Sequence, residues 1–545
     1  MIDDLSRKGA KAQRKRRKLE GNDPLRLCAF AGKLLFIMTA LIFHGHFYQP
    51  PRENPWTGEV EQEIGAAPYH DWNERIHAEC YAPNVAARVG DHVVNNYAQI
   101  SFNFGPTLLS WMEKHHPETY ARIIAADKES VAVRAGHGNA IAQAYGHAIL
   151  PLCNDRDRLT QVVWGLADFR HRFGREPESM WLPETACNDA TLDLLIDQGL
   201  RFVILAPAQA SRYRVVGSDD WHDVSDSSID GSRPYVYFHN DHSGRSIAIF
   251  FYNGPVARAI AFEKALTSSE RLVGMIKTAS AGKQMINIAI DGETYGHHFK
   301  FGDLCLAHVL DVEGPRENFW ITNYGEFLDR FPPQHEVDLK PGPHGEGTAC
   351  SCAHGVSRWI RNCGCHTGGD STWNQEWRGP LRSALNHLRD RSAEGFEDLG
   401  SRLFRDAWQA RNAYVDVLLK RCSPAEFLAK HVQRALSPAD EIRAFTLLEM
   451  QRNALLMFTS CGWFFYDLSG IETIQVLKYA ARVIELSDQL GLPSHRKTFL
   501  EMLGEAKSNL TEKGTGTDIY LRDAEPSDSW STSDGRWPDN SCLPA

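Results

Sequence analysis

The sequence lacks an excess of positive charge and a long apolar run free of charged residues. It has 59 lysines and arginines against 69 aspartates and glutamates, a net charge of -10 at neutral pH, which argues against a nucleic-acid partner. The apolar run from residue 25 to residue 43 contains Arg26 and Lys33 and has no small-x-small cleavage site. It therefore predicts neither a membrane span nor a signal peptide, and we expect a cytoplasmic protein with no membrane partner.

The sequence also lacks the closely spaced cysteines of a disulfide-rich secreted protein. The 12 cysteines of this 545-residue chain stand mostly alone in apolar surroundings. Reduced thiols are therefore expected. The exception is a cluster over residues 350–366, with Cys350, Cys352, Cys363, Cys365 and two nearby histidines. Zinc suits such ligands, but C-x-C spacing is tighter than the usual C-x-x-C, so free or transiently paired thiols remain the alternative. We expect no cofactor in catalysis, and the four cysteines are candidate ligands of a structural zinc.

Seven short apolar stretches alternate with helical stretches over about 250 residues, which predicts repeated βα units and a parallel sheet. No G-x-G-x-x-G follows the first of them, so a seven-stranded (β/α)7 barrel is favoured over a dinucleotide-binding sheet. The predicted strands are residues 39–44, 99–104, 131–135, 179–182, 202–206, 247–252 and 285–290.

The later part of the chain predicts a mainly α-helical C-terminal domain. Ser423-Pro424-Ala425-Glu426 and Ser437-Pro438-Ala439-Asp440 each place a serine N-cap, a proline at the first position and an acid at the third. A further helix is expected over residues 470–490, followed by Gly491-Leu492-Pro493.

Changes in composition divide the chain into five segments. We expect a basic, disordered arm over residues 1–37, the barrel over 38–315, a Gly-, Pro- and Cys-rich connecting region over 316–379, the helical domain over 380–522 and a disordered tail over 523–545. Met38 is an alternative candidate for the first residue of the natural chain.

Two predicted strands end in a carboxylate. Met180-Trp181-Leu182-Pro183 leads into Glu184, and the run from residue 286 to residue 290 leads into Asp291. Barrel enzymes hold their chemistry at the carboxyl ends of the strands, so two such acids predict acid/base or nucleophile/acid work. An acid after a strand is also a common helix N-cap. Trp181 offers an aromatic face beside Glu184, and Tyr295 offers a hydroxyl after Asp291.

Histidines follow the first and third predicted strands. His44 and His46 stand two residues apart on the first strand and are followed by Gln49 and a Pro-Pro turn. Such a pair can ligate a metal or donate hydrogen bonds to a substrate. His147 stands in Tyr145-Gly146-His147, where a glycine lets the backbone approach a ligand. A single histidine of this kind more often has a structural role.

These stretches resemble glycoside hydrolase family 57, which includes α-amylases, 4-α-glucanotransferases, branching enzymes and α-galactosidases, and in particular a bacterial subgroup with a long C-terminal region of no assigned role. The resemblance covers about residues 38–520. Its five motifs lie at residues 44–51, 138–152, 181–184, 291–296 and 460–465. The family pattern His-x-His-Gln-Pro reads His46-Phe47-Tyr48-Gln49-Pro50 here, so Tyr48 replaces the second histidine.

The resemblance implies a retaining glycoside hydrolase or transglycosylase that acts on an α-glucan or another oligosaccharide. Glu184 matches the family's nucleophile and Asp291 its acid/base. The substrate-binding residues that it suggests, together with the readings above, are His46, Gln49, His147, Trp181, Tyr295 and Trp463. It does not distinguish hydrolysis from transfer or branching.

Two other functions stay open at this point. A metal-dependent hydrolase of the polysaccharide deacetylase kind would use His44, His46 and Asp291 as ligands of a water-activating metal. A non-catalytic glycan-binding protein would keep the barrel without turnover.

Overall fold

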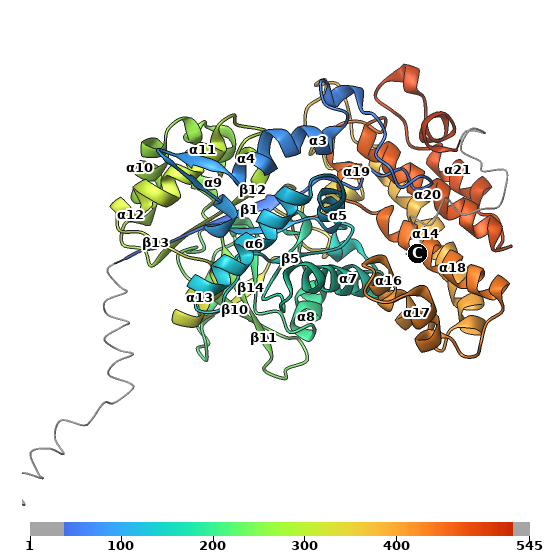
Figure 1. Ribbon diagram of the computed structural model, residues 1–545, viewed down its shortest axis with the longest axis horizontal. Coiled ribbons are helices and arrows are strands. Elements are labelled where there is room, and N and C mark those ends of the chain that lie inside the picture. Colours follow the sequence, from blue (N-terminus) through green and yellow to red (C-terminus); the bar gives the residue numbers. More distant parts are fainter. Residues whose placement is uncertain (1–37, 527–545) are drawn as a thin grey trace, which may run out of the picture.

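The computed structural model describes residues 38–526, so the predicted N-terminal arm and almost all of the predicted tail lie outside the described residues. A region of parallel strands with surrounding helices and a helical region lie side by side along the longest axis (Figure 1). The first of these regions comes from the earlier part of the chain and the second from the later part, as the sequence predicts.

Seven parallel strands form the (β/α)7 barrel. β1 pairs with β12 and β4, β5 pairs with β6, and β7 pairs with β11. Single bridges from Phe102 to Ala140 and from Ser179 to Phe202 connect these pairs. Between β11 and β12, Asn253 N donates to Asn287 O at 2.7 Å. The strands are β1 (Ala40–Phe47), β4 (Ser101–Phe104), β5 (Ala142–Gln143), β6 (Met180–Trp181), β7 (Phe202–Leu205), β11 (Ser246–Phe251) and β12 (Met285–Asp291).

The prediction of a third strand over residues 131–135 is wrong. Residues up to Val133 belong to the helix α6 (Pro117–Val133), and the strand at this place in the barrel is β5. The buried residues of α6 include Ile123, Ala126, Asp127 and Ser130, a spacing of three and four that buries one helix face. A strand of two residues is too short to show the alternation of apolar and polar residues by which strands are recognised in a sequence.

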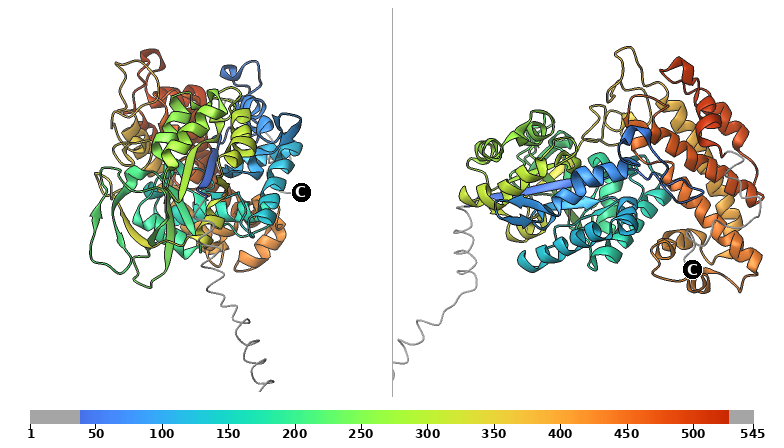
Figure 2. Two further views of the ribbon diagram at one scale, coloured as in Figure 1. Left: turned by 90° about the vertical axis from the view of Figure 1, so that its left-hand side faces the viewer. Right: turned by 45° about the horizontal axis from the view of Figure 1, so that its top comes forward.

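β1 lies between β12 and β4 in the barrel wall, and all eight of its residues are buried. A strand buried on both faces reads as a continuous apolar run, which is why the sequence reveals it. The end-on view shows strands near the middle with helices around them (Figure 2). These helices are α5 (Pro106–His115), α6, α7 (Asp155–Phe173), α8 (Asp189–Asp197), α9 (Gly254–Phe262), α10 (Ser269–Ser280) and α11 (Gly302–His308).

A mixed extension continues the sheet beyond β11, in the strand order β7-β11-β10-β14-β8-β9. In it β10 and β14 are parallel, and the other pairs beyond β11 are antiparallel. It consists of β8 (Ala210–Val215), β9 (His222–Asp223), β10 (Tyr235–Phe238) and β14 (His335–Leu339). β13 (Trp320–Ile321) pairs with β1, so the chain stays against the barrel as far as β14.

The helical region contains the helices that the sequence predicts. The Ser423 hydroxyl accepts from Glu426 N at the start of α17, and the Ser437 hydroxyl accepts from Asp440 N at the start of α18. The predicted helix over residues 470–490 is α20. The main helices are α14 (Arg378–Leu403), α15 (Ala407–Ala413), α17 (Pro424–His431), α18 (Pro438–Leu456), α20 (Ile471–Gln489) and α21 (Arg496–Leu503).

The two regions meet through specific contacts near the ends of the strands. Ala148 forms an antiparallel bridge with Thr459, and Ser460 N donates to His147 O at 3.0 Å. The buried Arg411 guanidinium donates to Asp157 at 2.8 Å, which ties α15 to α7. The helical region is therefore in place to contribute to a site at the carboxyl ends of the barrel strands.

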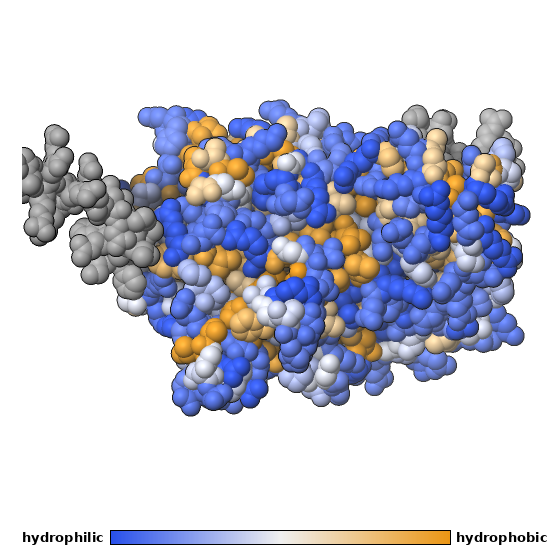
Figure 3. All heavy atoms as spheres, turned by 90° about the horizontal axis from the view of Figure 1, so that it is seen from below, coloured by the Kyte–Doolittle hydropathy of each residue, from blue (hydrophilic) through white to orange (hydrophobic). Residues whose placement is uncertain are grey.

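The face of the molecule seen from below is mostly hydrophilic (Figure 3). From below, hydrophobic side chains appear in separate patches over both regions rather than as one continuous face (Figure 3). Between residues 38 and 526, none of the helices combines the length and the apolar character that crossing a membrane requires.

Candidate active site

Glu184 stands immediately after β6, in the short 3-10 helix η5 (Pro183–Thr185). Glu184 and Thr185 have φ values of 57° and 50°, a left-handed backbone that is uncommon for residues other than glycine. The buried Gln209 amide holds this turn, because it accepts from Thr185 Oγ1 and donates to Thr185 O, both at 2.8 Å. Strained backbone that the surroundings hold in place is typical of functional sites.

Asp291 is the last residue of β12, directly opposite His46 in the β1 register, and it is exposed. The turn that follows needs glycine at 292, since a Cβ there would lie 2.3 Å from the Phe47 ring. The close approach of β1 and the turn thus fixes where Asp291 leaves the strand.

The two acids lie close enough to interact electrostatically. Burial raises the pKa of Glu184 to about 7, and the Asp291 charge adds to this rise. The Ser351 hydroxyl, which donates to Glu184 Oε2 at 2.5 Å, and the Arg358 charge act in the opposite direction. A carboxyl with a pKa in this range has both its ionised and its protonated form accessible near neutral pH. Glu184 can therefore serve as a carboxylate and still take up a proton without a large free-energy cost.

A third acid, Glu293, lies close enough to Asp291 to interact with it electrostatically. It is buried and accepts from Tyr81 Oη at 2.7 Å and from Tyr48 N at 2.9 Å. Burial raises the pKa of Glu293 to about 8, and the Asp291 charge contributes to the rise. No sequence pattern assigns a role to Glu293, although it stands two residues after Asp291. Its contacts hold Tyr48 in place beside the histidines.

Five stacked rings line the site in the order Tyr48, His147, His46, Trp181 and His44. Successive ring centroids are 3.7, 5.2, 5.0 and 4.8 Å apart, and the ring planes differ by 19° or less. Burial lowers the pKa of His46 to about 4 and that of His44 to about 3. The stack is therefore uncharged at neutral pH, which suits hydrogen bonds to neutral sugar hydroxyls.

The histidine nitrogens are held by neighbouring side chains. His44 contacts Ser101 Oγ at 2.9 Å and Asn103 Oδ1 at 3.1 Å, and His46 Nε2 lies 3.2 Å from His147 Nε2. Within residues 38–526, the donor atoms of His44, His46 and Asp291 do not converge on a point where a metal ion could bind. Both nitrogens of His44 are already engaged by side chains, so the deacetylase-like ligand set is not supported.

Four of the six predicted substrate-binding residues lie in the ring stack or directly beside it. His46, His147 and Trp181 belong to the ring stack, and the indole nitrogen of Trp181 is buried without a hydrogen-bond partner in the described chain. Gln49 follows Tyr48, donates to its carbonyl oxygen at 3.0 Å and accepts from Arg52. Trp181 is only 6% exposed, so it packs against the histidines more than it presents an open face.

Tyr295 and Trp463 lie outside the ring stack, and their role in substrate binding stays a prediction. Each is 0% exposed. Tyr295 belongs to the barrel core, and Trp463 lies in the core of the helical region, stacked on Phe458 and beneath the Arg382 guanidinium. Burial of a large ring is strongly favourable, and here the core competes successfully for both.

The loop after β14 makes contacts with Glu184 that no sequence pattern predicts. Cys350 N donates to Glu184 O at 2.9 Å, and the next residue supplies the Ser351 hydroxyl. Tyr252, which follows β11, interacts electrostatically with Cys350, Asp291 and Glu184, and burial raises its pKa. The sequence indicates a polar loop between the two regions, but it does not indicate which residues of the barrel this loop contacts.

The four cysteines predicted as zinc ligands separate in the structure. Cys350 faces Glu184 and Thr185, whereas Cys352, Cys363 and Cys365 gather with His354. The predicted ligand set is therefore wrong at Cys350. All ten cysteines of residues 38–526 are free thiols.

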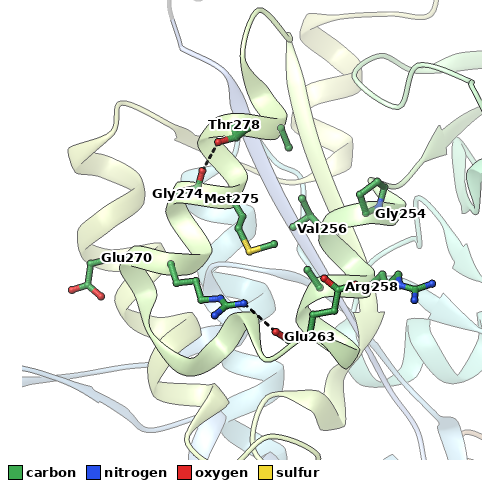
Figure 4. A pocket seen from close by; sticks show the side chains of 12 residues that line it. Gly254, Val256, Arg258, Glu263, Glu270, Gly274, Met275 and Thr278 are labelled. Carbon is green, nitrogen blue, oxygen red and sulfur yellow. Dashed lines mark hydrogen bonds and ion pairs between the residues drawn. The ribbon is translucent and has the colours of Figure 1, made fainter.

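A groove of about 820 Å³ adjoins the site. Cys350 and Tyr252 line one part of it, and Asp230 and Lys283 line another. A second pocket, of about 790 Å³, lies between α9 and α10 on the outside of the barrel (Figure 4). It contains neither Glu184 nor Asp291, so its position argues against a role in their chemistry.

Comparison with known proteins gives two family matches. The model described as Glycosyl hydrolase family 57 matches residues 40–340, and the model described as Domain of unknown function (DUF3536) matches residues 373–531. An α-amylase 1 of Dictyoglomus thermophilum is 23% identical over 199 residues, which are 36% of this chain and only 26% of that protein's length.

Two solved structures share the fold. One is an exo-type maltose-forming amylase from Pyrococcus sp. ST04, with a TM-score of 0.62 and 15% identity over 85% of this chain and 82% of the other. The second is a GH57-type branching enzyme from Pyrococcus horikoshii, with a TM-score of 0.51 and 14% identity over 90% of this chain and 98% of the other. At these identities the likeness shows a common fold.

Proposed function

The chain belongs to glycosyl hydrolase family 57, and on this basis we propose that it is a retaining glycoside hydrolase or transglycosylase that acts on α-linked glucans. The observation that carries the proposal is the placement of Glu184 and Asp291 after two barrel strands, near enough for one charge to raise the pKa of the other. An α-amylase, a maltose-forming amylase and a branching enzyme among the similar proteins support the substrate class.

In the proposed double displacement, Glu184 is the nucleophile and Asp291 the acid/base. A Glu184 carboxylate oxygen bonds to the anomeric carbon as the bond to the glycosidic oxygen breaks, and Asp291 gives its proton to that oxygen. Asp291 then takes a proton from water or a sugar hydroxyl, whose oxygen displaces Glu184 from the anomeric carbon. The exposed position of Asp291 suits a group that must meet both the leaving and the incoming molecule.

The remaining residues of the site would bind and orient the sugar. His46, His147 and Gln49 offer neutral hydrogen-bonding groups, and the unpartnered indole N–H of Trp181 is a further donor. Tyr48 presents a hydroxyl where the family pattern has an imidazole, which favours a different contact in the subsite it lines.

Product analysis on maltooligosaccharides tests this function. We expect the first products to carry the α-anomeric configuration by proton NMR, because two inversions at the same carbon restore it. Products longer than the substrate would indicate transfer, and glucose or maltose alone would indicate hydrolysis. Initial formation of the β-anomer, or binding of maltooligosaccharides without any bond cleavage, would contradict the proposed mechanism.

The Ser351 hydrogen bond predicts a pH effect. Ser351→Ala removes a donor that favours the ionised form of Glu184, so the pKa of Glu184 rises above 7. Since the nucleophile must be ionised, we expect the acidic limb of kcat/KM to move to higher pH by about one unit, the equivalent of about 1.4 kcal/mol. The matched control is Ser357→Ala, which removes a hydroxyl that contacts Arg361 in the same loop. A limb that moves equally in both variants, or toward lower pH in Ser351→Ala, would contradict this role.

A further inference from the structure

Three cysteines and a histidine of the loop after β14 converge at one place. Cys352, His354, Cys363 and Cys365 each place a sulfur or a ring nitrogen within 4.8 Å of the others. We propose that these four residues bind one zinc ion in a tetrahedral site, and that this ion holds Ser351 against Glu184.

The distances fit a metal site better than a disulfide. Cys352 Sγ lies 3.9 Å from both Cys363 Sγ and Cys365 Sγ, and Cys365 Sγ lies 3.4 Å from His354 Nδ1. Zn–S bonds of about 2.3 Å and Zn–N bonds of about 2.0–2.1 Å give tetrahedral edges of about 3.8 Å and about 3.6 Å. A disulfide would need sulfurs about 2.05 Å apart. These three distances are close to the edges of a zinc-sized tetrahedron, and the remaining donor pairs lie within 4.8 Å of one another.

The chemistry of the ligands also selects the ion. Three thiolates and one imidazole are soft and borderline donors, which zinc prefers over the oxygen-loving magnesium and calcium. Four protein ligands leave no open position, which is typical of a structural site rather than a catalytic one. Arg378 Nη1 donates to Cys365 O at 2.6 Å, and Arg378 is fully buried, so the backbone that carries this ligand is held from behind.

The site anchors the loop that reaches Glu184. Ser351 is the residue before Cys352, and Ala349 pairs with Cys352 in a tight turn. Thr348 pairs with Cys187 on the near side of this turn, and Arg358, between the second and third ligands, donates to Phe464 O at 3.2 Å. An ion at Cys352 would thus fix the Ser351 hydroxyl between the barrel and the helical region.

The first experiment measures metal content. We expect the full chain, purified without a polyhistidine tag, to contain about one zinc per molecule by mass spectrometry. Cys365→Ser should lower this content at least tenfold, whereas the matched control Cys350→Ser, a change at the excluded cysteine of the same loop, should retain it. Zinc lost equally from both variants, or retained in Cys365→Ser, would overturn the assignment.

A second measurement uses the wild-type chain, so that it does not depend on whether Cys365→Ser folds. After the zinc is removed with a chelator, we expect one equivalent of Co²⁺ to give the strong visible absorption of a tetrahedral site and a sulfur-to-cobalt charge-transfer band. Co²⁺ spectra without the charge-transfer band, or no binding of either ion, would contradict a thiolate site.

The link to Glu184 rests on the proposed function and is tested separately. We expect removal of zinc to move the acidic limb of kcat/KM to higher pH, as Ser351→Ala does, and to have little further effect in Ser351→Ala. If the wild type contains zinc but its pH profile does not change when the zinc is removed, the positioning role is overturned. Zinc binding without any glycoside cleavage would leave the metal site standing and would contradict the proposed function alone.

Discussion

We expect Glu184→Gln to lower kcat on maltooligosaccharides by about 10⁴-fold or more, the scale seen when a nucleophile is removed from an enzyme that uses covalent catalysis. A glutamine amide keeps the size and polarity of the side chain but cannot form the glycosyl-enzyme intermediate. The Ser351 hydroxyl, now 2.5 Å from Glu184 Oε2, can still donate to the amide oxygen, so the loop contact survives. Steady-state kinetics over one hour or more would measure the residual rate.

The stability of the same variant separates lost chemistry from a lost fold. The pKa of Glu184 is raised from 4.5 to about 7 in the folded protein, so its stabilising contribution is present below pH 4.5 and is lost as pH rises through 7. Glutamine stays neutral at every pH. Above pH 7 we therefore expect Glu184→Gln to be more stable than the wild type, by about 3 kcal/mol at the limit, with no such gain below pH 4.5. Thermal unfolding at pH 4.5 and pH 8 measures the difference.

The exposed Glu376 offers a matched control, since it lies outside the site. Glu376→Gln should retain the wild-type kcat. If Glu184→Gln kept a kcat within tenfold of the wild type, Glu184 would not be the nucleophile. If it lost activity together with stability at pH 8, the loss would report on folding instead.

Asp291→Asn gives the second large effect, and its size depends on the leaving group. An asparagine cannot protonate the glycosidic oxygen, so we expect kcat/KM on maltooligosaccharides to fall by about 10²–10⁴-fold. An α-glucosyl fluoride needs no such protonation. With this substrate the first step should stay close to the wild-type rate, and the intermediate should accumulate because no base activates water.

A burst of fluoride, followed by a slow steady state, would be the signature of this partition. Asp311→Asn, which only breaks a contact with His92 at 2.9 Å, serves as the control. Equal losses on the fluoride and on the glucan would show that Asp291 has no acid role.

Local sequence patterns predict the parts of this molecule that local physics determines. β1 and β12 are long strands buried along their length, and the apolar run of each stops where a polar residue begins the site. The caps at Ser423 and Ser437 satisfy free backbone N–H groups with side chains three residues away, so they are visible in four-residue windows. The same locality places Glu184 and Asp291 at strand ends before the fold is known.

The rest of the site depends on contacts between distant segments. Ser351 lies 167 residues from Glu184 along the chain, and no local pattern connects them. Tyr295 and Trp463 stand in motifs that suggest a binding role, yet each ring is buried in a different core. Cys350 and Cys352 form a C-x-C pair in the sequence. The tight turn between Ala349 and Cys352 nevertheless places the two thiols beside different neighbours. Burial and pairing across the fold decide these outcomes.

The contact of His147 with Ser460 bears on how the two halves of the chain can evolve. The imidazole Nδ1 lies 2.7 Å from the Ser460 hydroxyl, which belongs to the half matched by a domain of unknown function. Trp359 Nε1 donates to the carbonyl oxygen of the same serine at 3.2 Å. A recombination event that exchanged the helical half would have to supply a hydroxyl at this point or leave His147 misaligned. The two halves are therefore expected to be inherited as one unit.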